Sequence, residues 1–312
     1  MSPNTSTIIY TGLDIAKANF QLHFESQLLE LPNTTAGHRR LVTLLAAVPG
    51  VQVICEATGG YERALVAALH QAGIAVSVLN PARVRHFARA QGQRAKTDRI
   101  DAAVLTSYGS ALRPAPTPAR SSVEQQLNEL VRRRLQILEL LVAQRQQADR
   151  LDLPALRRQA RSLVRRLERD LAQIETLLKE LRTQAELDQR LQRLEAISGV
   201  GSITALSVLA EVPELGRLTR RQVAALAGLA PHPRESGRWQ GRRCIGGGRA
   251  AVRRALYMAA LCATRSNRIL REFYQRLRQA GKPAKLALTA VMRKLIVLMN
   301  HALKYPNFSL AT

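Results

Sequence analysis

The first third of the chain alternates between short apolar runs and longer amphipathic stretches. The runs have the continuous or period-two pattern of strands, and the stretches have the three- and four-residue apolar spacing of helices. We predict strands at Thr7–Asp14, Asn19–Phe24, Leu28–Leu31, Val51–Cys55 and Ile74–Leu79. We predict helices at Thr34–Ala47, Tyr61–Ala72, Ala82–Ala90 and Thr97–Leu112, with Thr34 or Thr35 capping the first of them. The pattern therefore indicates a mixed α/β domain that begins with an antiparallel meander.

The middle of the chain has a helical pattern after a proline-rich segment. Pro114, Pro116 and Pro118 are expected to form a linker, because spaced prolines cannot continue a helix. From Ser121 to about Leu194 apolar positions recur every three or four residues, and Pro154 interrupts them. We therefore predict two long helices folded as a hairpin or coiled coil, because an apolar stripe needs a partner. An internal hairpin and a contact between subunits fit this pattern equally well.

The last part of the chain is expected to be an all-helical unit. The predicted helices are Ile197–Leu209, Arg220–Ala227, Arg249–Ala263, Asn267–Gln279 and Pro283–Leu303. Between the second and third of them lies Gly228–Gly248, which is rich in Gly, Pro and Arg and poor in apolar residues. The whole pattern divides the chain into three expected domains, residues 1–112, 113–194 and 195–312.

The net charge of the chain indicates what it binds. The 312 residues carry a net charge of +24, which is distributed as +3 over residues 1–112, +6 over 113–194 and +15 over 195–312. Clustered Lys and Arg displace the counterions condensed on phosphates, so nucleic acid is the expected partner. An anionic membrane surface, or a merely soluble surface, is the alternative reading of a basic chain.

The sequence does not favour a zinc or disulfide-rich protein, a secreted protein or a membrane protein. Cys55, Cys244 and Cys262 have neither zinc-site nor disulfide spacing, so we expect reduced, structural thiols. The amino end has no basic segment followed by an apolar run, as a signal peptide would have. The apolar stretch Val291–Leu303 contains two cations, and we expect it to be too short and charged to span a bilayer. We expect a cytoplasmic protein without a membrane partner.

Four acids stand out in the nearly neutral first domain. Asp14 ends the first predicted strand, Glu56 follows a central one, and Asp98 and Asp101 lie at i and i+3 on a helix. The predicted element order is that of a ribonuclease-H-like domain, although other mixed-sheet folds share parts of it. There the four carboxylates would meet at one sheet edge and hold Mg²⁺, or Mn²⁺ as a substitute, for phosphodiester chemistry. Each acid taken alone fits equally a turn cap or a solvated ion pair.

The last domain contains two further candidate sites. Gly199 and Gly201 precede a predicted helix, where backbone amides suit a phosphate, although a simple tight turn explains the two glycines equally well. Ser236 lies within a basic stretch, and alone it reads as a serine in a flexible loop. The candidate phosphate-binding cations are Arg234, Arg238, Arg242, Arg243, Arg249, Arg253 and Arg254. Trp239 fits stacking on a base as well as packing.

Several segments together resemble one known family. They are Gly12–Lys17, Cys55–Tyr61, Lys96–Ala102, Ala227–Pro231 with Glu235–Gly237, and Ile245–Gly248 with Arg253–Ala260. They are similar to the acidic and carboxyl-terminal motifs of the DEDD transposases of the insertion-sequence one-ten family. The resemblance covers nearly the whole chain, and the central helices are its only generic part.

The resemblance implies a fold and an activity. It implies a RuvC-like amino-terminal domain, which holds Mg²⁺ through Asp14, Glu56, Asp98 and Asp101, and a carboxyl-terminal domain in which Ser236 is the nucleophile. It implies that Ser236 forms a covalent phosphoserine link to DNA and that strands exchange through a Holliday-junction-like intermediate. A structured non-coding bridge RNA would pair with donor and target DNA. The protein would be a homo-oligomer, a dimer or tetramer, in which the acids of one subunit can complete the serine site of another.

Two other functions compete with a transposase or recombinase. A hydrolytic, RuvC-type junction endonuclease would use the four acids and water, and would form no covalent adduct with DNA. A non-catalytic nucleic-acid-binding protein would have the acids as solvated charges and no tight site for Mg²⁺ or Mn²⁺.

Overall fold

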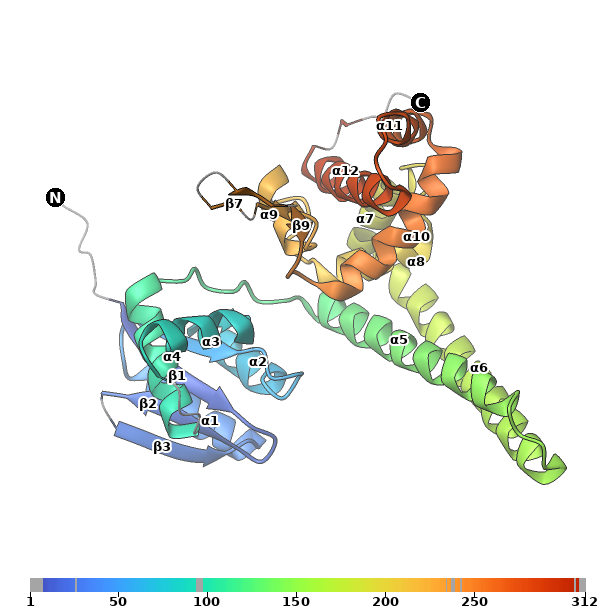
Figure 1. The fold of residues 1–312 in the computed structure, drawn as a ribbon. Coiled ribbons are helices and arrows are strands. Elements are labelled where there is room, and N and C mark those ends of the chain that lie inside the picture. The colour runs from blue at the N-terminus through green and yellow to red at the C-terminus, as the bar shows by residue number, and fades with distance from the viewer. Residues whose placement is uncertain are drawn as a thin grey trace. The chain divides into compact units, whose positions relative to one another are not determined.

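The chain folds into two compact units, Met1–Ala119 and Arg120–Thr312, which we call unit 1 and unit 2 (Figure 1). The computed structural model describes residues 8–25, 27–93, 98–233, 235–236, 239–241, 243–305 and 307–308. The side chains of residues 98, 99, 235, 236, 239 and 240 lie outside this description.

Unit 1 is built on a mixed five-stranded sheet with the strand order β3-β2-β1-β4-β5. The strands are β1 (Ile9–Ile15), β2 (Asn19–Phe24), β3 (Gln27–Pro32), β4 (Val51–Glu56) and β5 (Ala75–Leu79). The helices are α1 (Thr35–Ala46), α2 (Arg63–Gln71), α3 (Pro81–Ala90) and α4 (Asp98–Leu112). β1, β2 and β3 pair antiparallel, whereas β1, β4 and β5 pair parallel. This arrangement confirms the predicted α/β class and its antiparallel meander.

Each face of the sheet is covered by its own pair of helices. Leu13 and Cys55 are fully buried in one core, together with leucines of α1 and α2. Ile54 is fully buried in the other core, together with residues of α3 and α4. Because successive side chains of a strand point to opposite faces, each residue two positions from Ile54 also faces α4.

The proline-rich segment is fixed along the edge of the sheet. The amide of Thr117 donates to the Val76 carbonyl (2.7 Å), and the Thr117 hydroxyl accepts from the Val78 amide (3.0 Å). The buried Gln52 side chain donates to the carbonyl of Pro114 (2.7 Å). The segment expected to be a linker therefore satisfies the exposed edge of β5, as edge strands require, and unit 1 extends to residue 119.

In its described residues, unit 2 is helical apart from the short strands between α9 and α10. Its helices are α5 (Ser122–Ala148), α6 (Pro154–Arg182), α7 (Ala185–Glu195), α8 (Ser202–Glu211), α9 (Arg220–Leu226), α10 (Ala250–Ser266), α11 (Arg268–Gln279) and α12 (Ala284–Lys304). α5 and α6 are the two predicted long helices, packed on each other as an internal hairpin, and a shorter third helix, α7, follows them, which the pattern did not separate from α6. A single hydrophobic core joins residues of α5, α6 and α7 to residues of α8, α10 and α12.

α12 supplies much of that core. Within the described ranges it is the one helix whose length and composition would allow it to cross a membrane, because its 21 residues extend beyond the stretch Val291–Leu303 that we expected to be too short. About half of the relevant window is buried inside the protein. Its apolar residues, such as Val291, Leu295 and Met299, are completely buried against the other helices of unit 2.

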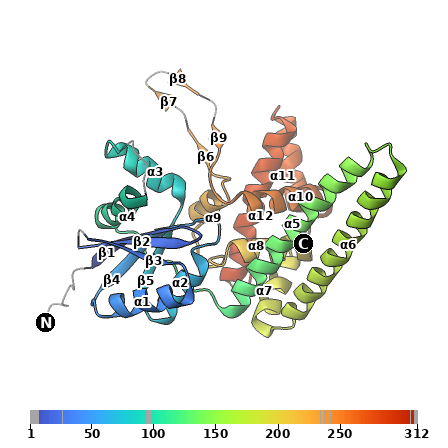
Figure 2. The ribbon, with the colours of Figure 1, turned by 90° about the horizontal axis from the view of Figure 1, so that it is seen from below.

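The glycine- and arginine-rich stretch between α9 and α10 contains a β-hairpin. β6 (Pro231–His232) pairs with β9 (Cys244–Ile245), and β7 (Glu235–Ser236) pairs with β8 (Trp239–Gln240). In Figure 2 these strands form a narrow arm beside the helices of their own unit. Short strands with few apolar residues give almost no periodic signal, so the sequence pattern did not predict the arm.

Arg182 links three helices of unit 2. Its guanidinium donates to both carboxylate oxygens of Glu195 (2.8 Å each), to Asp188 (2.8 Å) and to the Ser202 hydroxyl (3.3 Å). The hydrogen bonds to Glu195 and Asp188 raise the pKa of Arg182.

We expect Arg182→Ala to lower the free energy of unfolding of unit 2 by roughly 1–2 kcal/mol, because the network is charge-assisted but partly solvated. Arg182→Lys should recover only part of this, since an ammonium lacks the planar fork. Urea titrations followed by circular dichroism measure both variants. Arg158→Ala, which removes an exposed arginine of α6, is the control and should change little. Equal effects of the two alanine variants would contradict the assigned role.

Candidate active site

Two of the four predicted acids lie side by side at the ends of neighbouring strands. β1 and β4 are parallel with Leu13 opposite Cys55, so Asp14 and Glu56, each one residue further on, are the next neighbours. Both side chains are half-buried. Because Leu13 and Cys55 belong to the core under α1 and α2, the two acids face the opposite side, where α4 lies.

α4 runs antiparallel to β1, in close contact with it. A Cβ atom on Gly12 would collide with the carbonyl oxygen of Ala102, and one on Gly109 would meet Tyr10 and Ile54 at 2.8 Å. The Gly12 amide donates to the Thr106 hydroxyl (2.8 Å). Higher residue numbers in β1 thus match lower ones in α4, and the amino end of α4 lies over the carboxyl ends of β1 and β4.

This direction brings the other two acids to the same edge. Asp14 lies two residues beyond Gly12, a rise of about 7 Å, and Asp98 lies four residues before Ala102, about 6 Å along the helix. Asp101 is half-buried and adjoins Ala102. The side chain of Asp98 is outside the description, and within the described residues no three His, Cys, Asp or Glu side chains come close enough to hold a metal ion. The donor chemistry, carboxylate oxygens, fits Mg²⁺.

The loop after β4 is organised by a fifth acid. One carboxylate oxygen of Glu62 accepts from the amides of Thr58 (3.1 Å) and Gly60 (2.8 Å) and from the Thr58 hydroxyl (3.1 Å). Burial, with the nearby charges of Glu62 and Glu56, raises the pKa of the Cys55 thiol far above its usual range. The sequence motif from Cys55 to Tyr61 therefore combines an inert buried thiol, one candidate ligand and a loop held by Glu62. Sequence reasoning had given Glu62 no role.

Ser236 lies in the arm of unit 2. It is the last residue of β7, where it pairs with Trp239 of β8. The side chains of Ser236 and Trp239 lie outside the described residues, as do Arg234, Arg238 and Arg242 altogether. The predictions made for these residues therefore stay predictions.

Two of the arginines predicted to bind nucleic acid, Arg249 and Arg253, form hydrogen bonds within the protein. Arg249 binds both oxygens of Glu214 (2.9 and 3.0 Å) and the Glu211 carbonyl (2.6 Å). Burial tends to raise the pKa of Glu214, but the hydrogen bonds and charge of Arg249, together with a backbone hydrogen bond and the charge of Arg120, outweigh it, and the pKa is lowered. Arg253 donates to the Gly247 carbonyl at the base of the arm. The geometry favours structural roles for both, and we do not carry them forward as nucleic-acid contacts.

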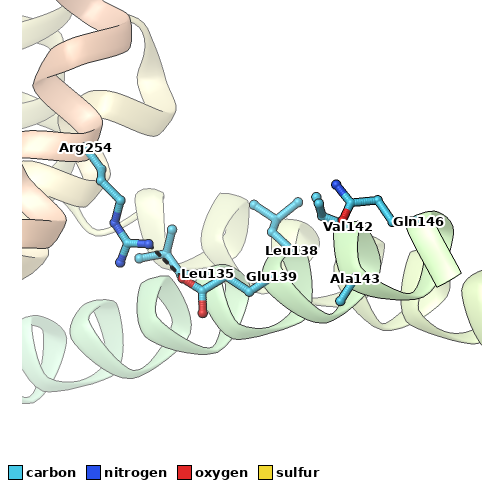
Figure 3. A pocket seen from close by; sticks show the side chains of 7 residues that line it. All are labelled: Leu135, Leu138, Glu139, Val142, Ala143, Gln146 and Arg254. Atoms are coloured by element: carbon cyan, nitrogen blue, oxygen red, sulfur yellow. Dashed lines mark hydrogen bonds and ion pairs between the residues drawn. The ribbon is translucent and has the colours of Figure 1, made fainter.

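The remaining candidates for nucleic-acid binding in unit 2 are Arg243, Arg254, Gly199 and Gly201. Arg254 is largely exposed and pairs with Glu139 (2.7 Å) beside an open apolar groove on α5 (Figure 3). Arg243 is described and has interactions of its own. Gly199 has φ 100° and packs its backbone on Ala263, whereas Gly201 begins α8 with open space around its Cα. Packing thus accounts for Gly199, whereas the phosphate contact at Gly201 stays a prediction.

Comparisons with known proteins agree on one class. A family model for transposases of the DEDD IS110 type matches residues 11–151, and the model "Transposase IS116/IS110/IS902 family" matches residues 191–275. The pilin gene-inverting proteins of Moraxella bovis and Moraxella lacunata are each 28% identical to the chain, which aligns over 93% of its length and 94% of theirs.

The chain has a mixed-sheet domain with acids at one edge, followed by a helical domain. Together with the family matches, this architecture defines a DNA transposase or recombinase. The two matched regions, one in each half of the chain, agree on the same family. The chain belongs to the IS110 family of transposases.

Proposed function

We propose that the chain cleaves and exchanges DNA strands in a metal-dependent reaction that passes through a serine–DNA intermediate. Asp14, Glu56, Asp98 and Asp101 would hold Mg²⁺, which supplies charge neutralisation at the phosphate and activation of the attacking oxygen. The observation that carries this proposal is the contact of Gly12 with Ala102, because it directs the amino end of α4 to the strand ends that bear the other acids.

In the serine step, one phosphate ester bond is exchanged for another. The Ser236 Oγ forms a bond to phosphorus, the bond from phosphorus to one deoxyribose oxygen breaks, and the hydroxyl proton ends on the departing sugar oxygen. The family membership and the position of Ser236 at the end of β7 support this role. A second transfer, in which a sugar hydroxyl displaces Ser236, joins the new strand and regenerates the serine.

The proposal includes three partners. The DNA substrates follow from the family. A structured bridge RNA that guides donor and target choice is supported by the net charge of +24 and by the motif resemblance. The acids belong to unit 1 and Ser236 to unit 2, so the reaction requires units from the same or different subunits of a homo-oligomer to meet on one phosphate.

Ser236→Ala tests the mechanism. In cells that carry the reading frame with its flanking DNA, we expect the covalent protein–DNA adduct and recombination to fall to background, while DNA binding persists. The adduct is detected by DNA label that stays with the denatured protein. The control is Ser266→Ala, since that exposed hydroxyl bonds to the Cys262 carbonyl of its own helix. An adduct that persists in Ser236→Ala would remove this serine from the mechanism, and a wild type that cuts DNA without any adduct would indicate the hydrolytic alternative.

A further inference from the structure

Gln21 lies in the same cross-strand row as the acids. In the sheet register Asp14 is opposite Gln21, and Gln21 is opposite Glu30. The neighbours of Gln21 along β2, Phe20 and Leu22, are buried under α1 and α2, so the Gln21 side chain faces α4, as Asp14 does.

The amide of Gln21 has one oxygen that needs a partner. Its Nε2 donates a long hydrogen bond to Glu30 (3.5 Å), and Asn19 also donates to Glu30. Because the nitrogen is taken by Glu30 on β3, the Oε1 atom needs a donor from elsewhere, and the strand on the other side of β2 is β1, which carries Asp14. This Oε1 is the one buried side-chain nitrogen or oxygen, within the described part of the chain, that lacks a hydrogen-bond partner.

An unsatisfied buried oxygen is costly unless a ligand supplies the missing donor. A cation held by the acids would bring such donors, because Mg²⁺ keeps several waters when carboxylates bind it. Groups that accept from such waters orient the shell and raise metal affinity.

We propose that Gln21 is a further metal-site residue, whose Oε1 accepts a hydrogen bond from a water of the divalent cation held by the acids. Glu30 fixes the orientation of the amide, and Asn19 fixes Glu30. This inference rests on the proposed function, and it adds residues of β2 and β3 to a site otherwise assigned to β1, β4 and α4.

Gln21→Leu separates this role from a structural one. The variant removes the orphaned oxygen and keeps the size of the side chain, so the melting temperature in EDTA should stay the same or rise. Calorimetric titration of the full chain with Mn²⁺ should show affinity weakened about tenfold, the effect typical of losing such a partner.

Gln52→Leu is the matched control. Gln52 is also buried in the sheet, but its amide is satisfied by Ser77 (2.9 Å) and Pro114 (2.7 Å). We expect its loss to lower the melting temperature and leave the Mn²⁺ affinity of the folded protein unchanged. The two glutamines should therefore respond in opposite ways.

The outcomes also distinguish this proposal from the proposed function. If Asp14→Asn abolishes Mn²⁺ binding while Gln21→Leu binds as tightly as the wild type, the role of Gln21 is overturned and the four-acid site stands. A wild type that binds no Mn²⁺ overturns both. A fall in melting temperature without a change in affinity for Gln21→Leu would make the residue structural.

Discussion

Replacing Asp101 by Asn is expected to reduce recombination by about a thousandfold or more. The amide keeps the shape of the side chain but removes the charge that neutralises a divalent cation. A metal contribution of several kcal/mol to the transition state corresponds to three or more factors of ten in rate. Asp14→Asn should behave in the same way, because Asp14 faces the end of α4 that bears Asp101.

Rates of strand exchange, measured over a range of Mg²⁺ and Mn²⁺ concentrations, check this expectation. Glu25→Gln is the control, since Glu25 is an exposed carboxylate of the same unit in the turn after β2, at the opposite end of β1 from Asp14. Full activity in Asp101→Asn or Asp14→Asn would remove that acid from the proposed site. A loss of the same size in Glu25→Gln would show that the assay reports net charge instead.

The sequence predicted the sheet almost completely, because its strands carry strong local signals. β2 was predicted at its exact bounds, and Thr34 caps α1 as expected, its hydroxyl accepting from the Gly37 amide (3.4 Å). Buried parallel strands such as β4 read as continuous apolar runs. These signals depend on the residues of each element alone, so no tertiary information was needed.

The errors in the fold prediction came from tertiary contacts. The segment from Pro114 to Pro118 contains no helical pattern, but only the fold shows that its carbonyls and Thr117 complete the edge of β5. The arm around Ser236 consists of two-residue strands, which are too short for a period to be seen. The pattern also did not separate α6 from α7, where Arg182 at the end of α6 folds back onto Glu195 at the end of α7.

Some residues of the candidate site could be predicted from the sequence, and others could be recognised only in the fold. Spacing placed Asp98 and Asp101 on one helical face, and strand ends placed Asp14 and Glu56, because carboxylates are rare in unit 1. Nothing in the sequence singled out Gln21, because a polar residue in an alternating strand normally faces solvent. Its significance comes from its register opposite Asp14 and its buried, unsatisfied oxygen. Conversely, Arg249 looked like a phosphate ligand only until its pairing with Glu214 was visible.

The contact between Gly12 and α4 leads to the largest expected effect on stability. In Gly12→Ala the new methyl group would meet the carbonyl of Ala102 and the amide of Thr106, which are backbone atoms that cannot rotate away. We expect unit 1 to lose about 3 kcal/mol of unfolding free energy, the upper part of the usual range for overpacking. For a domain of this size that corresponds to a melting temperature lower by more than about 10 °C.

Gly109→Ala provides a graded comparison on the same helix. There the methyl group would meet Ile54 and Tyr10 at 2.8 Å, which is a less severe overlap than the one at Gly12, so we expect a smaller loss of about 1–2 kcal/mol. Because α4 carries two of the acids, the folded fraction of Gly12→Ala should also bind Mn²⁺ more weakly, whereas Gly109→Ala should not. Thermal melts of both variants, with and without Mn²⁺, measure these differences. If Gly12→Ala melts like the wild type, α4 does not rest on β1 at Gly12, and the convergence of the four acids loses its physical basis.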